Sequence, residues 1–184
     1  MDVHADVDFL CDAQELSLVD GSFQAVIAMA VLEHVLDPQR VLAEMRRVLV
    51  DGGGVCSTIQ FIQQVHEGRH DFTHFTLSGH RRLFHEFREL RSGMVAGPGT
   101  ALVWSLEHLA LSLVGRGALR LPVKAAARTL FFWIKYLDHL VKDRPEAMDA
   151  AACTYFLGRV DPAGGTSDRE IVNRYRGAGQ IEHL

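Results

Sequence analysis

The stretch DAQELSLVDGSFQAVIAMAVLEHVLDPQRVLAEMRRVLVDGGG, residues 12–54, decides the fold. It follows a short apolar run at residues 7–11, which is typical of a buried strand that ends in a loop. A turn at residues 20–22 precedes residues 25–29, which are apolar on both faces and therefore predict a parallel strand in the centre of a sheet. This order of elements predicts an α/β domain.

A capped amphipathic helix follows the predicted central strand. Asp37 is a preferred N-cap residue and Pro38 suits the first helical position. The glycine run 52–54 predicts the end of the helix, and residues 55–59 predict the next strand. One face of the helix is apolar, at Val41, Leu42, Met45, Val48 and Leu49. The resulting strand–helix–strand crossover indicates a parallel sheet.

Several short motifs of this stretch resemble those of one protein family. They are Asp12-Ala13, DGSF at residues 20–23, VLEHV at residues 31–35, and RVL at residues 47–49 followed by Gly52-Gly53. Together they are similar to the class I S-adenosylmethionine-dependent methyltransferases of the type 11 group, over roughly residues 2–100. The resemblance implies a Rossmann-like three-layer α/β sandwich with the strand order 3-2-1-4-5-7-6.

The amino-terminal part of the family pattern is missing from this sequence. Class I methyltransferases hold the methionine end of the cofactor with a glycine-rich loop after the first strand, and no Gly-x-Gly precedes Asp12. We therefore expect a truncated methyltransferase fold that lacks the first strand and this loop. Loss of a central strand would leave unpaired backbone groups, unless residues 7–12 move across to pair with residues 25–29.

The resemblance also implies a set of cofactor-binding residues for S-adenosylmethionine. Asp12 would accept a hydrogen bond from the adenine amino group, and the Ala13 backbone N–H would reach a ring nitrogen. Asp2 stands where the family has the residue that holds the ribose hydroxyls, while Ala30 and Val31 would approach the methionine portion through the backbone. The alternatives are a loop or cap carboxylate for Asp12 and a frayed terminus for Asp2.

Methyl transfer from a sulfonium mainly requires alignment, because the cofactor already activates the leaving group. A hydroxyl or amine acceptor must still lose a proton, and His34, His66, His70 and Asp71 are the candidate catalytic residues. The last three lie in a polar and aromatic loop, residues 63–76, at the carboxyl edge of the predicted sheet. His34 could equally be a structural histidine in the turn before the helix.

A metal site is a weaker interpretation of the same loop. His66, His70 and His74 recur at every fourth residue and would align on a helix. The intervening Gly68 and the aromatic and threonine content favour a loop instead, so the sequence predicts no metal site.

The carboxyl-terminal half carries helical patterns and one more strand. Residues 100–147 contain two apolar helical patterns and predict a helical cap or insertion. Residues 151–158 predict the final strand. Residues 1–160 are thus expected to form one methyltransferase-like domain, and the glycine-rich residues 161–184 a flexible tail.

The second helical pattern has a basic side formed by Lys124, Arg128, Lys135 and Lys142. Such a face usually contacts only water. The alternative is an interfacial helix that receives a lipid-like acceptor. The sequence leaves both readings open.

Composition excludes several classes of protein. With 184 residues, 48% of them hydrophobic, and a net charge of −4, the chain is a globular domain without the strongly basic footprint of a nucleic-acid binder. Cys11, Cys56 and Cys153 suggest buried thiols in a reducing compartment. Without a signal peptide or transmembrane run, a cytoplasmic location is expected. A homo-oligomer is left open.

The sequence therefore predicts S-adenosylmethionine-dependent methylation of a small molecule, impaired if the glycine-rich loop is indispensable. A non-catalytic methyltransferase-like remnant that binds a partner through a sheet edge or the helical cap is the alternative. A metal-dependent hydrolase that uses the histidine loop is a third reading.

Overall fold

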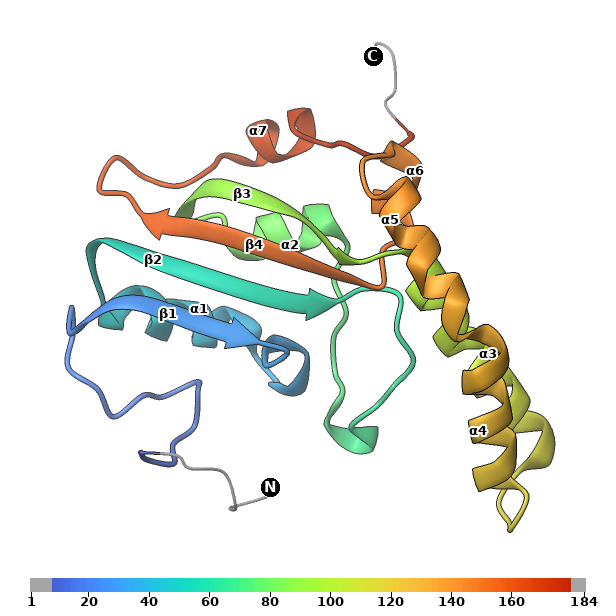
Figure 1. The fold of residues 1–184 in the computed structure, drawn as a ribbon. Coiled ribbons are helices and arrows are strands. Elements are labelled where there is room, and N and C mark those ends of the chain that lie inside the picture. Colours follow the sequence, from blue (N-terminus) through green and yellow to red (C-terminus); the bar gives the residue numbers. More distant parts are fainter. Residues whose placement is uncertain (1–7, 180–184) are drawn as a thin grey trace.

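The computed structural model describes residues 8–179, which fold around a four-stranded sheet (Figure 1). Its strands are β1 (Phe23–Met29), β2 (Leu49–Gln60), β3 (Phe87–Ala96) and β4 (Cys153–Val160). They lie in the order β1-β2-β4-β3, with β1 parallel to β2 and β4 antiparallel to both β2 and β3. This order matches strands 4-5-7-6 of the order implied by the family resemblance, so the predicted Rossmann-like α/β fold class is confirmed.

Helices pack on one face of the sheet and at one of its ends. Figure 1 shows α1 and α2 behind the sheet, while α3 and α4 form an antiparallel pair that projects beyond the end of β2. No helix within residues 8–179 is long and apolar enough to cross a membrane. The helices are η1 (Leu32–His34), α1 (Pro38–Val48), η2 (Gly68–His70), α2 (Leu77–Leu83), α3 (Pro98–Val114), α4 (Arg120–Phe131), η3 (Phe132–Leu137), α5 (Asp138–Val141), α6 (Pro145–Asp149) and α7 (Asp168–Asn173).

The core lies between the sheet and helices α1 and α2. Alternate residues of each strand face it, because successive side chains of a strand point to opposite faces. Phe84, at the carboxyl end of α2, stacks on Phe156 of β4 with ring centroids 4.8 Å apart. The buried apolar cluster is Ala28, Leu32, Val41, Leu42, Met45, Leu49, Val55, Ile59, Leu83, Phe84, Phe87, Phe156 and Val160.

Helix α1 begins as predicted and ends earlier than predicted. The Asp37 side chain accepts hydrogen bonds from the backbone N–H groups of Gln39 and Arg40, and Pro38 occupies the first turn. The helix ends at Val48, and the glycine run 52–54 lies inside β2 instead. The reason is that Leu49 already pairs with Phe23 of β1, so the sheet takes over the backbone hydrogen bonds before the glycines are reached.

The prediction of a strand at residues 7–11 is wrong for residues 8–11, which the structure describes and which form no strand. Phe9 and Leu10 are 52% and 61% exposed, and only an isolated bridge joins Asp12 to Glu15. The alternative pairing of this segment with residues 25–29 is likewise wrong. No described strand lies beside the segment to pair with its backbone.

The position predicted for β1 is wrong as well. Within residues 8–179, β1 is an edge strand that pairs with β2 alone. Its outward side chains Ile27 and Met29 are 70% and 55% exposed. An apolar pattern on both faces indicates that both faces suit burial, and here α1 and α2 bury only one of them.

Part of the segment predicted as a flexible tail forms a helix. Ser167 caps α7 through the backbone N–H of Glu170, and Ile171 is buried beneath it. The Arg81 guanidinium on α2 donates a hydrogen bond of 2.7 Å to the Arg174 carbonyl oxygen just after α7. The described part of this segment therefore adds a helix to the fold.

Candidate functional site

The carboxyl end of β1 carries an unusual backbone conformation. Ala30 has φ +53°, the positive φ of a left-handed conformation, which non-glycine residues adopt rarely. Its N–H donates a 3.2 Å hydrogen bond to the Thr58 carbonyl oxygen of β2, which holds the turn in place. Strained residues of this kind cluster at ligand sites, so Ala30 marks this edge of the sheet as the candidate site.

Helix η1 brings a buried carboxylate to the same edge. The Glu33 side chain is fully buried, and neither of its oxygens has a hydrogen-bond partner within residues 8–179. Burial raises the pKa of Glu33, an effect that its own backbone N–H and then the nearby His34, His66 and His74 partly oppose. An unpartnered buried carboxylate lowers the free energy of unfolding. Its presence therefore requires a structural or functional explanation.

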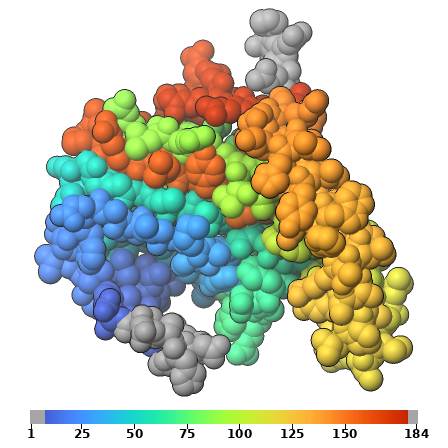
Figure 2. All heavy atoms as spheres, in the orientation of Figure 1, coloured from blue at the N-terminus to red at the C-terminus, as the bar shows by residue number. Residues whose placement is uncertain are grey.

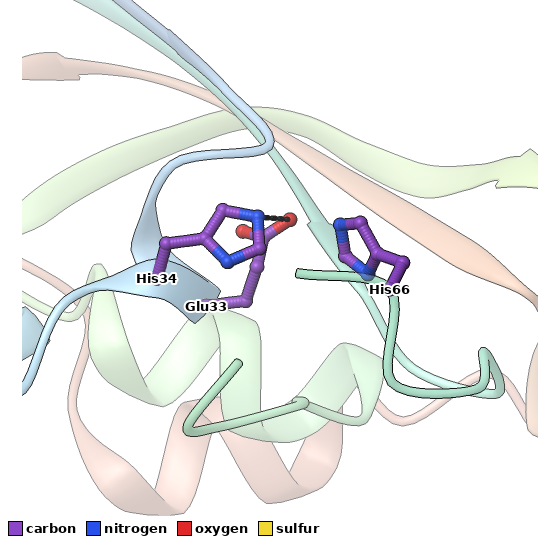
Figure 3. Close-up of side chains that lie close together, drawn as sticks. All are labelled: Glu33, His34 and His66. Atoms are coloured by element: carbon purple, nitrogen blue, oxygen red, sulfur yellow. Dashed lines mark ion pairs between the residues drawn. The ribbon is translucent and has the colours of Figure 1, made fainter. Parts of the chain in front are cut away.

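Two histidines face this carboxylate, as Figure 3 shows. His34 Nε2 lies 3.9 Å from Glu33 Oε1, and the centroids of the His34 and His66 rings are 4.8 Å apart. His34 comes from the turn after β1 and His66 from the loop after β2. The carboxyl ends of two adjacent parallel strands thus place these groups together.

The loop after β2 is fixed by a nearly buried carboxylate. The Asp71 side chain is 2% exposed, and it lies 3.2 Å from His66 Nδ1 and 2.8 Å from His74 Nε2. It also accepts a hydrogen bond from the His66 backbone N–H. Burial acts to raise the pKa of Asp71, but this N–H together with the two histidines holds the pKa below its ordinary value. Asp71 therefore orients both imidazoles.

The four predicted catalytic residues take different positions. His34, His66 and Asp71 lie in one cluster, whereas the His70 ring accepts a hydrogen bond from Arg69 Nε at 3.1 Å. His70 contributes its backbone carbonyl oxygen, which lies 2.9 Å from His34 Nδ1. Glu33 was not singled out from the sequence, and His74 was considered only within the weaker metal interpretation of the loop. The position of Glu33 inside the motif VLEHV was the feature of the sequence from which it could have been identified.

The predicted adenine-binding residues lie on the segment that precedes β1. Asp12 is exposed, and its Oδ1 accepts a 2.8 Å hydrogen bond from the Gln14 backbone N–H, which lowers the pKa of Asp12. Ala13 and Val31 are each partly buried and pack against the core. Gln14 Oε1 accepts a hydrogen bond from the Asp37 N–H and so ties this segment to the start of α1. Asp2 lies outside the described residues.

A pocket of about 390 Å³ lies between the loop after β2 and the helices α3 and α4. Glu107, which is 7% exposed, forms ion pairs there with Arg128 (Nε to Oε2, 2.8 Å) and Lys124 (Nζ to Oε1, 3.7 Å). The pocket combines apolar surface with positive charge. It is lined by Gln63, Gln64, Val65, His66, Trp104, Glu107, His108, Leu111, Arg120, Lys124 and Arg128.

Comparison with known proteins gives a sequence match over the first third of the chain. Residues 2–57 match the family model described as a methyltransferase domain. This stretch contains Asp12, Ala30 and His34 of the candidate site. No curated protein matches the sequence.

Several solved structures resemble the fold. A chain of the complex between the Haloferax volcanii Trm112 methyltransferase activator and a proposed methyltransferase matches with a TM-score of 0.51 and 17% identity, over 85% of this chain and 64% of that one. Phosphoethanolamine N-methyltransferase 2 of Haemonchus contortus, solved with S-adenosyl-L-methionine, matches with a TM-score of 0.49 and 15% identity, over 83% of this chain and 36% of that one. A proposed sarcosine dimethylglycine methyltransferase from Galdieria sulphuraria gives a TM-score of 0.48 and 15% identity, over 82% and 58%.

The chain spans less than two thirds of the length of each of these structures. At 17% identity, the similarity to the Haloferax volcanii complex concerns the fold. The chain thus has a Rossmann-like methyltransferase fold, with a methyltransferase-domain sequence over residues 2–57.

Proposed function

We propose that this chain transfers a methyl group from S-adenosylmethionine to a small, lipid-like acceptor. The observation that carries the proposal is the convergence at the carboxyl ends of β1 and β2. There the strained backbone of Ala30 follows β1, and the His34 and His66 rings lie with their centroids 4.8 Å apart, in a class I methyltransferase fold. In open α/β sheets this edge is where ligands bind.

The residues present would contact the adenine and the methionine portion of the cofactor. Oδ2 of the exposed Asp12 has only a 3.5 Å contact with Gln14 Nε2, so the carboxylate keeps the capacity to accept a hydrogen bond from an adenine amino group. Ala13 would approach the adenine ring, and Ala30 and Val31 would approach the methionine end through their backbone. The cofactor, when bound, supplies a methyl group activated by the sulfonium.

The chain's own groups would orient the acceptor and receive it beside the histidine cluster. Asp71 and the His70 carbonyl oxygen fix the ring orientations of His66 and His34. A hydroxyl or amine acceptor held beside His66 would lose its proton at this cluster. Most of the rate enhancement would come from alignment.

The acceptor is proposed to be lipid-like because of the surface around the pocket. Helices α3 and α4, with the helical segments that follow, expose many large apolar side chains. The pocket itself adds the cations Arg120, Lys124 and Arg128, of which the last two pair with Glu107. An amphiphile with an anionic headgroup complements this combination. The most exposed apolar side chains here are Leu109, Leu113, Leu119, Leu121, Leu130, Trp133, Tyr136 and Leu140.

The location of the protein is proposed from its thiols. Cys11, Cys56 and Cys153 form no disulfide. Burial raises the pKa of Cys153 to about 11, so this thiol is neutral and inert at neutral pH. Unpaired thiols of this kind suit the reducing cytoplasm.

A calorimetric titration of the folded chain with S-adenosylmethionine tests whether the chain binds this cofactor. We expect saturable binding that Asp12→Ala weakens about tenfold, the effect of losing one hydrogen bond to a charged group. Asp51→Ala is the matched control, because Asp51 is an exposed carboxylate away from the proposed site. Equal affinity in folded Asp12→Ala and wild type would contradict the adenine contact.

The acceptor is tested separately with methyl-labelled cofactor. We expect label to enter the organic-soluble fraction of a mixture that offers anionic amphiphiles together with water-soluble amines and phenols. Label confined to the water-soluble acceptors would overturn the lipid-like assignment. Folded chain that binds no cofactor would overturn the methyltransferase proposal and favour a binding module.

A further inference from the structure

Three groups of different chemistry converge at the edge of the sheet. A carboxylate oxygen of Glu33 and one ring nitrogen each of His34 and His66 all lie within 4.8 Å of one another. Figure 3 shows both rings facing the carboxylate. Residues 33 and 34 belong to η1, whereas His66 lies in the loop after β2, so the tertiary fold creates the cluster.

Each histidine has one ring nitrogen engaged and one left for a ligand. His34 Nδ1 lies 2.9 Å from the His70 carbonyl oxygen and therefore carries the proton that it donates. His66 Nδ1 lies 3.2 Å from Asp71 Oδ2. Nε2 of each ring keeps its lone pair. Metal-ligating histidines are typically oriented by a carbonyl or carboxylate on the opposite nitrogen in this way.

The Glu33 carboxylate supplies a second, independent indication. It is fully buried and both oxygens lack a hydrogen-bond partner within the described part of the chain. The neighbouring imidazole of His34 is 3.9 Å away, beyond hydrogen-bonding distance. Leaving a buried carboxylate unpaired destabilises the folded chain, whereas a cation at the centre of the cluster would compensate its charge.

We propose that Glu33, His34 and His66 bind one divalent transition-metal ion of the zinc type. Two imidazoles and one carboxylate suit Zn²⁺, whereas Mg²⁺ and Ca²⁺ prefer oxygen ligands alone. Zinc–ligand distances are about 2.0–2.2 Å. The ligand atoms of the three side chains, which lie within 4.8 Å of one another, would therefore have to move closer together on binding the metal.

The open coordination position would be available to a ligand from the adjoining pocket, which His66 also lines. Three protein ligands with one open position are characteristic of catalytic rather than structural zinc. Metal at this position would favour the deprotonated form of an acceptor hydroxyl beside His66. That consequence rests on the proposed function, but metal binding itself does not.

Zinc titration of tag-free, chelator-treated chain tests the site, with isothermal calorimetry and the visible absorption of a Co²⁺-substituted sample as readouts. We expect one Zn²⁺ per chain, competed by Co²⁺ and not by Mg²⁺. Glu33→Gln and His66→Gln should each weaken binding at least about 100-fold. Asp71→Asn should weaken it about 10- to 100-fold, since Asp71 acts through His66.

His139→Gln is the matched control, because His139 is exposed and lies on α5 rather than at the site. Its zinc affinity should equal that of the wild type. If Glu33→Gln fails to fold, His66→Gln decides, because His66 lies in a loop with a side chain 30% exposed. Equal zinc affinity in folded His66→Gln and wild type, or no stoichiometric binding at all, would overturn the proposal. Neither result depends on cofactor binding or methyl transfer.

Discussion

His80 shows how a single residue can be structural in a chain whose other histidines gather at a site. It is fully buried between α2 and the sheet, with Nδ1 3.0 Å from Thr154 Oγ1 and Nε2 3.3 Å from Ser57 Oγ. Burial lowers the pKa of His80 from 6.5 to about 3. Its neutral form is therefore the form that the folded state requires.

This residue makes the stability of the chain depend on pH. Unfolded chain takes up a proton on His80 below pH 6.5, and folded chain does so only near pH 3, so the contribution of His80 to the free energy of unfolding is complete above pH 6.5 and declines below it. We expect a decline of up to about 1.4 kcal/mol per pH unit between these values. Chemical denaturation at a series of pH values measures it.

The His80→Gln variant serves as the reference, because glutamine can offer hydrogen bonds to Thr154 and Ser57 without titrating. The difference in unfolding free energy between wild type and variant should shrink as pH falls from 6.5 toward 3. A difference that is constant over this range would show that His80 does not stay neutral in the folded chain.

At the scale of elements, α3 is capped by a residue that is distant in sequence. The Asp138 carboxylate, at the start of α5, accepts hydrogen bonds from the backbone N–H groups of Gly97, Gly99 and Thr100, at 3.1, 2.7 and 3.1 Å. It also accepts one from the Thr100 hydroxyl at 2.7 Å. These N–H groups belong to the N-cap residue Gly97 and to the first turn of α3, whose N-cap residue offers no side-chain hydrogen bond of its own. One side chain thus joins α5 to the base of the projecting helix pair.

Removing this cap should destabilise the chain measurably. We expect Asp138→Ala to lower the free energy of unfolding by about 2–3 kcal/mol, since several donors at a helix N-terminus lose a charged acceptor. Urea denaturation monitored by circular dichroism gives the value. Asp143→Ala, an exposed aspartate in the same segment, should change it by less than about 0.5 kcal/mol.

The exposed apolar surface of the helix pair α3 and α4 also predicts that the chain binds lipid surfaces. Leu140, which is 75% exposed, extends the apolar surface of this pair, and we expect Leu140→Ser to weaken binding to anionic phospholipid vesicles about tenfold. Cosedimentation with vesicles at two salt concentrations measures it. Val172→Ser is the control, because Val172 is 72% exposed but lies on α7.

One result would contradict the prediction that the helix pair binds lipid surfaces. Equal sedimentation of wild type and Leu140→Ser would leave the apolar surface without a role at lipid, and the basic side chains of α4 would then simply face water.

At the scale of the whole molecule, the helices of residues 8–179 leave one face of the sheet uncovered. Helices α1 and α2 cover the opposite face, and the rainbow surface in Figure 2 shows β1, β2 and β4 directly at the exterior. Ile27, Met29 and Leu157 contribute apolar side chains to this face, at 70%, 55% and 38% exposure. A contiguous apolar sheet surface is typical of an interface.

We expect a second copy of the chain to cover this face in solution, because two twisted sheets pack face to face through interdigitating apolar side chains. Sedimentation velocity over a range of concentrations should show a dimer that Ile27→Lys dissociates at least about tenfold more readily. Val19→Lys is the control, since Val19 is 76% exposed in the segment before β1. A wild-type chain that sediments as a monomer at every concentration would contradict this expectation.

The sequence by itself determined the local features of this protein. The turn at Gly21, the Asp37 cap with Pro38, the apolar stripe of α1 and the succession of strands and helices follow from residue preferences and from periods of two or 3.6 residues. The motifs shared with one family added the strand order of the four-stranded sheet. Such features depend on neighbours a few residues apart, and they can be read without the fold.

Only the tertiary structure decided how these elements combine. It placed β1 at an edge, brought Glu33 and His34 to His66 across more than thirty residues, and gave Asp138 the role of a cap for α3. The candidate residues predicted from the sequence included neither Asp138 nor Glu33. These contacts are set by how distant segments pack, and neither periodicity nor spacing along the chain encodes that geometry.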